Sequence, residues 1–259
     1  MSTRFILLAG FTLLPVFLLT GCQTNSKSKG KNAEAAAVGG PTGTPPAPQS
    51  LPTSVGTKNS YSKVNTSLPF IALTFDDGPH ATNTPRLLDM LKERNVKATF
   101  YVVATNVKRY PEIMRRIVAE GHEIGNHTVT HGNLTKMSPD EVRSELSRSR
   151  EAIMAATGIA PRTMRPPYGA ITSDQKDWIR REFGYPAILW SVDPEDWKKP
   201  GASVVAQRLV SGAAPGGILL VHDIHSSTID AMPSALDQLL AKGLQFVTVT
   251  QLIAMDGNG

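Results

Sequence analysis

Five short stretches of the sequence carry side chains that could do chemistry together. They read TFDDGPH at 74–80, HTVTH at 127–131, RPPYG at 165–169, DPEDW at 193–197 and LVH at 220–222. The first places Asp76 beside Asp77 at the end of an apolar run, where two like charges repel each other and add nothing to folding. Gathering several charges in one place is costly unless a cation or a reacting group uses them. The five stretches therefore predict a site that binds a cation or does acid–base chemistry.

The elements that must position these stretches follow from the alternation of apolar runs and helical periods. Strand-like runs such as 69–75, 97–103 and 217–223 alternate with helix-like segments such as 83–95 and 203–213. This alternation predicts parallel strands joined by helices, in a barrel or a doubly wound sheet. No glycine-rich nucleotide motif follows the first strand, which disfavours a nucleotide-binding sheet. Functional side chains of such folds lie where the strands end, so the five stretches are expected to meet on one face.

Local signals set some element ends. Ser138 stands three residues before Glu141, which predicts a capping box, and Gly158 suits the end of the same helix. Further strands are expected at 122–127, 163–167, 187–192 and 245–249, and further helices at 110–121, 173–184, 232–243 and 250–255.

Residues 1–21 have the pattern of a leader rather than of a folded element. A short basic start precedes an apolar stretch, and the sequence LTGC ends it at Cys22, the only cysteine. The pattern resembles a bacterial lipoprotein signal, which implies cleavage before Cys22 and lipidation of its thiol. The alternative is a transmembrane anchor, against which Pro15 and the short apolar length argue. A lone cysteine also excludes an internal disulfide.

Residues 22–68 are small, polar and rich in proline and glycine, which predicts a flexible linker with a reach of about 35 to 40 Å. The formal net charge of +5 lies outside the body. Five lysines and one glutamate fall in the linker and Arg4 in the leader, so the sequence from 69 onward has 21 basic and 21 acidic residues. This balance gives no support for nucleic-acid binding.

The five stretches, in this order, resemble the motifs of the polysaccharide deacetylases that share the NodB homology domain, carbohydrate esterase family 4, and are similar to those of peptidoglycan N-acetylglucosamine deacetylases. The resemblance covers 69–255. It implies an α/β fold, a distorted (β/α)7-type barrel forming a single catalytic domain. It also implies hydrolysis of N-acetyl groups, less often O-acetyl groups, from a sugar polymer with a divalent metal, commonly zinc.

The chemistry of the residues agrees with this resemblance. Asp77, His127 and His131 supply the three nitrogen and oxygen ligands that hydrolytic zinc takes, with a position left for water. The spacing of the two histidines is expected to place both rings on one side of a helical turn. Asp76 is then left as the base that takes the proton of the water. Co²⁺, Ni²⁺ or Mn²⁺ would also accept these ligands.

The remaining roles are carried over from the resemblance. His222 matches the acid that protonates the leaving amine, and Asp196 the carboxylate that stabilises its protonated form. Arg165 is expected to pair with Asp76, and the backbone N–H of Tyr168 to stabilise the oxyanion. Leu220, Trp197 and Pro167 are expected to bind substrate as pocket walls, whereas Trp190 is expected to be packing.

Two classes of function stay open. One is a metal-dependent deacetylase of a cell-envelope glycan, with peptidoglycan ranked above poly-N-acetylglucosamine, chitin-like polymers or O-acetylated xylan. The other is an inactive glycan-binding module, which would be expected to have lost a ligand, the base or the acid, although none is missing. The expected partners are the glycan and, through the lipid, a membrane, with no nucleic acid. We expect a monomer anchored in the cell membrane or outer membrane, facing the periplasm or cell wall.

Overall fold

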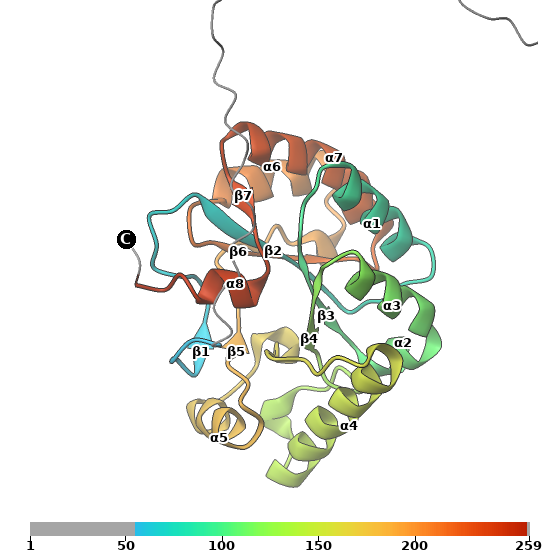
Figure 1. Cartoon of the computed structure of the whole chain (residues 1–259), viewed down its shortest axis with the longest axis vertical. Coiled ribbons are helices and arrows are strands. Elements are labelled where there is room, and N and C mark those ends of the chain that lie inside the picture. The colour runs from blue at the N-terminus through green and yellow to red at the C-terminus, as the bar shows by residue number, and fades with distance from the viewer. Residues whose placement is uncertain (1–54, 258–259) are drawn as a thin grey trace, which may run out of the picture. The chain divides into compact units, whose positions relative to one another are not determined.

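A computed structural model describes residues 55–257 as a curved parallel sheet surrounded by helices (Figure 1). The central strands are β2 (Phe70–Asp76), β3 (Thr99–Val102), β4 (Glu123–Asn126) and β6 (Ile218–His222), and they lie side by side in the order β4-β3-β2-β6. The short strand β7 (Gln245–Phe246) pairs with the start of β2, and β1 (Ser60–Tyr61) pairs with β5 (Ala187–Ile188). Every strand pairing is parallel.

Single-residue bridges close the sheet into a barrel. Met164 bridges to Asn126 at the end of β4 and also to Ala187 in β5, and Val192 bridges to Leu219 in β6. The wall between β4 and β6 is therefore made of isolated contacts rather than of long strands. This is the predicted distorted (β/α) barrel, which confirms the fold class.

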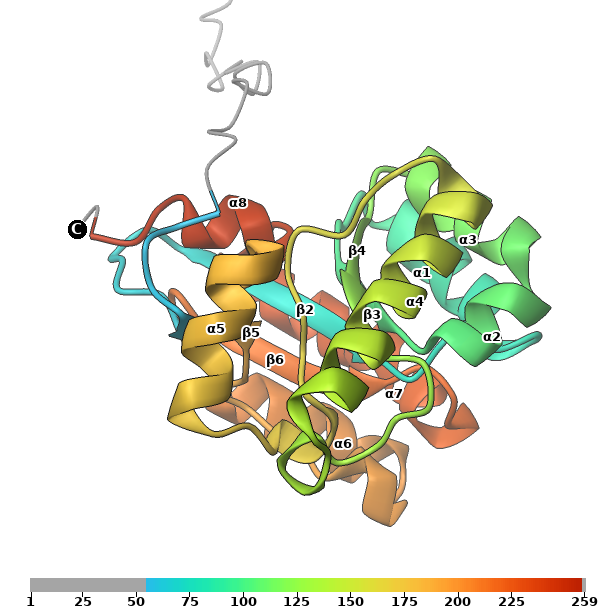
Figure 2. The same ribbon diagram turned by 90° about the horizontal axis from the view of Figure 1, so that it is seen from below.

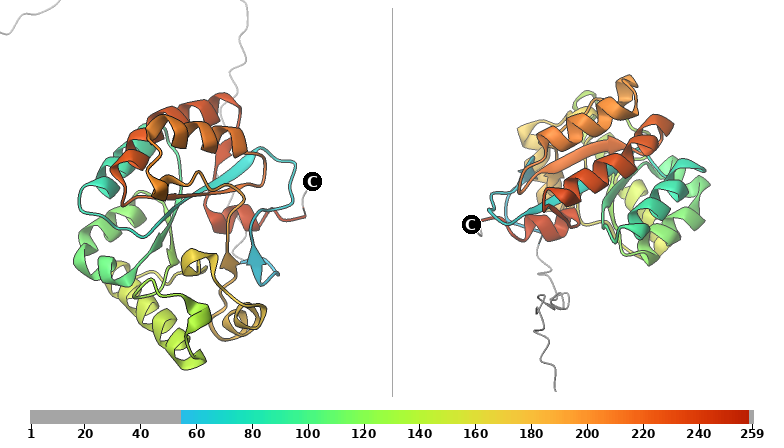
Figure 3. Two further views of the ribbon diagram at one scale, coloured as in Figure 1. Left: turned by 180° about the vertical axis from the view of Figure 1, so that it is seen from behind. Right: turned by 90° about the horizontal axis from the view of Figure 1, so that it is seen from above.

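Eight helices cover the outside of the described barrel. They are α1 (Asn83–Glu93), α2 (Ala104–Arg109), α3 (Pro111–Ala119), α4 (Pro139–Thr157), α5 (Ser173–Phe183), α6 (Ala202–Gly212), α7 (Ser226–Ala241) and α8 (Val249–Ile253). Short 3₁₀ turns span Leu134–Lys136, Pro167–Gly169 and Asp196–Lys198. Helices α1, α3 and α4 lie outside β3 and β4 (Figure 2), and α6 packs against α7 (Figure 3).

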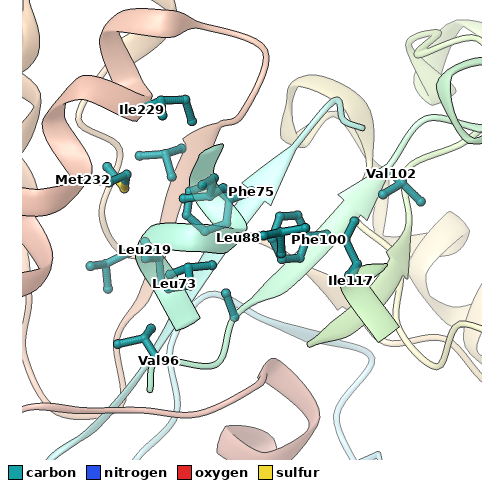
Figure 4. Packing of buried hydrophobic residues seen from close by; sticks show 14 of the residues in the cluster. Leu73, Phe75, Leu88, Val96, Phe100, Val102, Ile117, Leu219, Ile229 and Met232 are labelled. Atoms are coloured by element: carbon teal, nitrogen blue, oxygen red, sulfur yellow. The ribbon is translucent and has the colours of Figure 1, made fainter. Parts of the chain in front are cut away.

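The main hydrophobic core lies between the strands and these helices (Figure 4). The rings of Phe75 and Phe100, from neighbouring strands, stack with their centroids 5.3 Å apart. Leu88 of α1 and Ile117 of α3 are fully buried in the same cluster. Burial of both faces explains why the strands read as continuous apolar runs.

The ends of α4 follow the local sequence as predicted. The Ser138 side chain accepts a hydrogen bond from the Glu141 N–H, and the Glu141 carboxylate accepts one from the Ser138 N–H, which makes a capping box. The helix ends at Gly158, whose φ of 74° lies in the left-handed region that favours glycine.

The predicted boundary between linker and domain at residue 69 is wrong. Tyr61 and Val64 are each 2% exposed, and Tyr61 lies in β1, paired with Ile188. The folded body therefore begins at β1 or earlier. The sequence around Tyr61 is mostly polar, but Tyr61 and Val64 pack in one cluster with Ile188 of β5. The predicted leader, Cys22 and the linker as far as residue 54 lie outside the described residues.

Other differences concern element lengths. The predicted strand at 163–167 is reduced to the Met164 bridges, and those at 187–192 and 245–249 are reduced to two residues each. Helix α7 begins at Ser226, before the predicted start at 232, with Pro233 inside it, and α2 was not predicted. Within residues 55–257, no helix has the length and apolar character needed to cross a bilayer.

Candidate active site

All five sequence motifs meet at a pocket of about 430 Å³. It is lined by residues that follow successive strands or bridges: Asp76 and Asp77; His127 and His131; Pro166 and Tyr168; Trp190, Asp193 and Trp197; and Leu220, His222 and His225. The structure therefore brings the five motifs together on one face of the barrel, as expected.

Asp76 ends β2 and is only 3% exposed. Its Oδ1 accepts a hydrogen bond of 2.7 Å from Nη1 of Arg165, which is itself fully buried. Its other oxygen, Oδ2, lies 3.7 Å from Nε2 of His127. The predicted pairing of Arg165 with Asp76 is thus present, and it orients one carboxylate oxygen away from the metal-ligand group.

Each nitrogen of the buried Arg165 guanidinium donates a hydrogen bond. Nη1 also donates to Thr74 Oγ1 at 2.7 Å, and Nε and Nη2 donate to the carbonyls of Ile188 and Leu189, each at 3.1 Å. Its carbon lies 4.3 Å from the centroid of the Tyr101 ring, within the range of a cation–π contact. A buried charge this well bonded has little freedom to move, so the Asp76 carboxylate is held in one place.

Asp77, His127 and His131 form a three-ligand group. Asp77 Oδ1 lies 3.4 Å from His127 Nε2 and 3.1 Å from His131 Nε2, and the three ligand atoms all lie within 4.8 Å of one another. Asp77 Oδ1 is a buried oxygen with no hydrogen-bond donor among residues 55–257. Because His127 Nδ1 donates to the carbonyl of Arg165 at 2.7 Å, the lone pair of its ring is on Nε2, facing Asp77. The donor set and its orphaned oxygen fit a divalent ion.

The protonation of this group also suits a metal. Burial raises the pKa of Asp77, but the neighbouring imidazoles of His127, His131 and His222 outweigh burial and lower it to about 2. Burial lowers the pKa of His131, with a further contribution from His127. A carboxylate that stays ionised and an imidazole that stays neutral are the forms that bind metals.

The predicted helical turn at 127–131 is wrong. These residues form a loop, with Thr128 at a φ of 68° and His131 at a φ of 58°. The Asn126 side chain accepts from the N–H of Thr128, and the Thr128 hydroxyl accepts from the N–H of His131. The two rings still meet, at a centroid distance of 4.9 Å, because the loop folds back on itself rather than because it is helical.

His222 ends β6 and is bonded to Asp196 by two routes. Its Nδ1 and its backbone N–H lie 2.8 Å from Asp196 Oδ1 and Oδ2 respectively, and Thr228 donates its hydroxyl proton to Oδ2 at 2.7 Å. Burial alone would lower the pKa of His222, but Asp196, helped by Asp76 and Asp77, raises it to about 9. The imidazole is therefore protonated near neutral pH, with Nε2 left for the pocket.

The pocket walls differ in part from the prediction. Tyr168, with a φ of 61°, is 69% exposed, and Trp197 is 50% exposed at the rim, while Leu220 lies buried inside. Pro167 is buried and does not line the pocket. Its neighbour Pro166 does, because a 3₁₀ turn begins at Pro167.

Three lining residues were missed or given another role from the sequence. Trp190, predicted to be packing, lines the pocket and lies 5.7 Å from the Arg165 guanidinium. Asp193 lines it too while its side chain accepts from the N–H of Glu195. His225 follows His222 by three residues, its ring centroid 6.0 Å away. Asp193 opens the DPEDW motif and His225 stands three residues after His222, and these positions could have indicated from the sequence that both line the pocket.

Asp223 lies next to the site but does not line the pocket. Its carboxyl is fully buried and accepts a hydrogen bond from the Thr84 hydroxyl, while Oδ1 has no donor in the described part of the chain. Burial raises its pKa to about 7, and the charge of Asp77 adds to the effect. A side chain at Gly78 would collide with it, since a Cβ there would lie 2.4 Å from both carboxyl oxygens.

Comparison with known proteins is consistent with this geometry. The sequence pattern of the family described as Polysaccharide deacetylase matches residues 63–188. The peptidoglycan-N-acetylglucosamine deacetylase PgdA of Listeria monocytogenes is 44% identical over 182 residues, which are 70% of this chain and 38% of that protein. The chitooligosaccharide deacetylase of a Bradyrhizobium species is 45% identical over 154 residues, 59% of this chain and 70% of that one.

Solved structures agree. The crystal structure of a peptidoglycan N-acetylglucosamine deacetylase in complex with an N-oxidanyl-benzamide superposes with a TM-score of 0.70 at 37% identity, covering 73% of this chain and 90% of that one. The present chain thus spans well under half of the Listeria relative but nearly all of this solved domain.

Proposed function

Because the chain belongs to the polysaccharide deacetylase family, we propose that it hydrolyses the N-acetyl groups of a cell-envelope glycan, in the first place the N-acetylglucosamine of peptidoglycan, and releases acetate. One observation carries the proposal. A single pocket holds an arginine-paired carboxylate, a three-ligand metal group and a histidine whose pKa is raised to about 9. A base, a metal and an acid together are what metal-assisted amide hydrolysis uses.

Each side chain has a defined part in the reaction. An ion held by Asp77, His127 and His131 would supply an activated water and polarise the acetyl carbonyl. Asp76, whose Oδ1 is held by Arg165 at 2.7 Å, is the base that would take a proton from the attacking water.

The leaving amine needs a proton, and His222 is the residue placed to donate it. His222 gives the proton on Nε2 to the amide nitrogen as the C–N bond breaks, and Asp196 holds Nδ1–H at 2.8 Å so that the ring faces the pocket. The backbone N–H of Tyr168, at the rim, is assigned to the oxyanion. Trp197, Leu220 and Pro166 form the walls around the acetyl group.

We assign Zn²⁺ as the ion, because two imidazole nitrogens and one carboxylate oxygen are a common zinc set with a position left open. Metal analysis of the purified protein would test this assignment, and finding Co²⁺, Ni²⁺ or Mn²⁺ in place of Zn²⁺ would replace it.

The substrate is proposed from the names of relatives and from the domain they share. The Listeria relative is named for peptidoglycan, and this chain spans 38% of it, so the likeness covers only that part of the relative. The Bradyrhizobium relative is named for chitooligosaccharides, which makes these the second candidate. An inactive glycan-binding module is disfavoured because the ligands, Asp76 and His222 are all in place.

Acetate release tests the function. The full chain, stripped with a chelator and reloaded with Zn²⁺, is incubated with peptidoglycan, chitohexaose and acetylated xylan. Release from peptidoglycan that requires metal, and that falls at least about 100-fold in Asp76→Asn, is expected. Asp237→Asn, which changes an exposed carboxylate on α7, is the matched control and should retain activity.

Other outcomes change the conclusion. Faster release from chitohexaose would favour the second candidate, and release from xylan alone an O-acetyl esterase. If the chain binds Zn²⁺ but releases no acetate from any of the three, the catalytic proposal fails and the binding module replaces it.

We further propose that Cys22 carries a lipid and that a monomer is held on the cell membrane or outer membrane, facing the periplasm or cell wall. The leader and its single cysteine support this. Incorporation of labelled fatty acid into the wild type but not into Cys22→Ala is expected, with membrane fractionation and light scattering to follow. Equal labelling of both would refute the anchor.

A further inference from the structure

Glu145 is a buried carboxylate that the proposed chemistry does not use. It lies on α4, which runs outside β4 (Figure 2), and is 8% exposed. Its Oε2 accepts two hydrogen bonds from the backbone, from the N–H of Val129 at 2.8 Å and of Thr130 at 2.9 Å. These two residues stand between the metal ligands His127 and His131, so Glu145 contacts the loop and not the ligands.

The loop owes its shape to side-chain acceptors. Four successive N–H groups, those of residues 128–131, all donate to side-chain oxygens rather than to the backbone. Asn126 and Thr128 take one each, and Glu145 takes two. Asn126 also donates its amide to the carbonyl of Leu146, next to Glu145, at 2.9 Å, so α4 is joined to the loop at two points.

This shape is costly without those acceptors. Thr128 is β-branched and has a φ of 68°, and His131 has a φ of 58°, both in the region where side chains other than glycine are strained. Such a backbone persists only where its surroundings over-determine it. Glu145 accepts two of the four hydrogen bonds that these N–H groups donate, and it is the only one of the three acceptor residues that comes from another element, so it ties the loop to α4.

We propose that Glu145 is a positioning residue that pre-forms the metal site, by holding the 127–131 loop so that both imidazoles face Asp77 before any ion binds. The inference rests on the proposed metal site. Without Glu145, the loop would relax towards allowed backbone angles and each binding event would have to reorder it. Affinity for the ion falls as a result, although every ligand is still present.

The test measures metal binding rather than activity. Metal-free full chain is titrated with Zn²⁺ against a chromophoric chelator, and with Co²⁺, whose visible absorption reports the number and geometry of its ligands. Glu145→Ala removes both acceptor bonds and is expected to weaken Zn²⁺ binding by about 10- to 100-fold, with a reduced Co²⁺ spectrum. Glu145→Gln keeps a neutral acceptor of the same shape and should lie between Glu145→Ala and the wild type.

Two variants on the same helix separate positioning from general loss of stability. Glu151→Ala removes an exposed carboxylate and should leave both titrations unchanged. Val142→Ala makes a cavity at a fully buried position, so it should lower the melting temperature while leaving the affinity near that of the wild type.

The outcomes are distinguishable. Wild-type Zn²⁺ affinity and Co²⁺ spectrum in Glu145→Ala would overturn the inference and leave the proposed function standing. Equal weakening in Val142→Ala would also overturn it, because any destabilisation would then suffice. A wild type that binds neither ion would refute the proposed function itself. If Glu145→Ala does not fold, intermediate affinity in Glu145→Gln supports the inference and wild-type affinity refutes it.

Discussion

The protonation of His222 depends on one neighbour, and replacing that neighbour tests the assignment of the acid. Asp196→Asn keeps the shape of the side chain but removes its charge. Burial lowers the pKa of His222, and Asp196 is the main group that raises it to about 9. The ordinary histidine value is about 6.5, so the net shift is roughly 2.5 pKa units, or about 3 kcal/mol, and it is what remains after the opposing effect of burial. Asp196→Asn leaves burial in place together with the smaller contributions of Asp76 and Asp77, so we expect the pKa of His222 to fall by at least about 2 units.

The same change has a characteristic effect on stability. The folded pKa of His222 lies above the unfolded value, so the pair stabilises the fold fully below about pH 6.5, and this contribution is lost as pH rises through about 9. Asp196→Asn should therefore lower the free energy of unfolding by about 3 kcal/mol at pH 6 and by clearly less at pH 9.5.

Two measurements check this prediction. NMR titration of the histidine rings in metal-free protein gives the pKa directly, with His222→Gln to assign the signal, and urea denaturation at the two pH values gives the stability. Asp230→Asn, which changes an exposed carboxylate on α7, is the control and should alter neither. A His222 midpoint in Asp196→Asn within about 0.5 units of the wild type would refute the reasoning.

Three further predictions concern the site and its surroundings. His127→Ala should lose tightly bound zinc, whereas His222→Ala should keep zinc and lose acetate release; equal metal content after dialysis would mean that the roles are misassigned. Arg165→Met leaves Asp76 buried without its partner and should cost about 3 to 5 kcal/mol in urea denaturation, and a cost below about 1 kcal/mol would contradict a buried ion pair. Burial raises the pKa of Asp223 to about 7, so the wild type loses stability as pH rises from about 4 to 7. Asp223→Asn should therefore gain almost nothing at pH 4 and up to about 4 kcal/mol at pH 8, and an equal gain at both would exclude this explanation.

The order of strands and helices could be predicted from the sequence because both faces of the central strands are buried, so that these strands are continuous apolar runs. Runs such as that of β2, buried at six of its seven positions, leave few alternatives to a strand. The capping box of α4 is equally local, since Ser138 and Glu141 stand three residues apart and bond to each other. The motifs also met as expected, because parallel strands end at one edge.

What could not be predicted depends on partners far away in the chain. The spacing of His127 and His131 fits a helical turn as well as the observed loop, and two N–H groups of that loop donate to Glu145, which lies on a later helix. Tyr61 reads as part of a polar linker until its partner Ile188 is known. The reduction of the 163–167 strand to one bridged residue likewise has no signature in its composition.

The Arg165–Asp76 and Asp196–His222 pairs cross the part of the barrel wall, between β4 and β6, that is made only of isolated bridges among the described strands. Arg165 follows the Met164 bridge and reaches across to Asp76 and Thr74 on β2, and Asp196 follows the Val192 bridge and reaches His222 on β6. Both pairs therefore connect this wall to the continuous strands β2 and β6. The described barrel wall and the positions of Asp76 and His222 therefore depend on the same contacts, so the loss of either pair is expected to weaken the wall as well as to disturb the pocket.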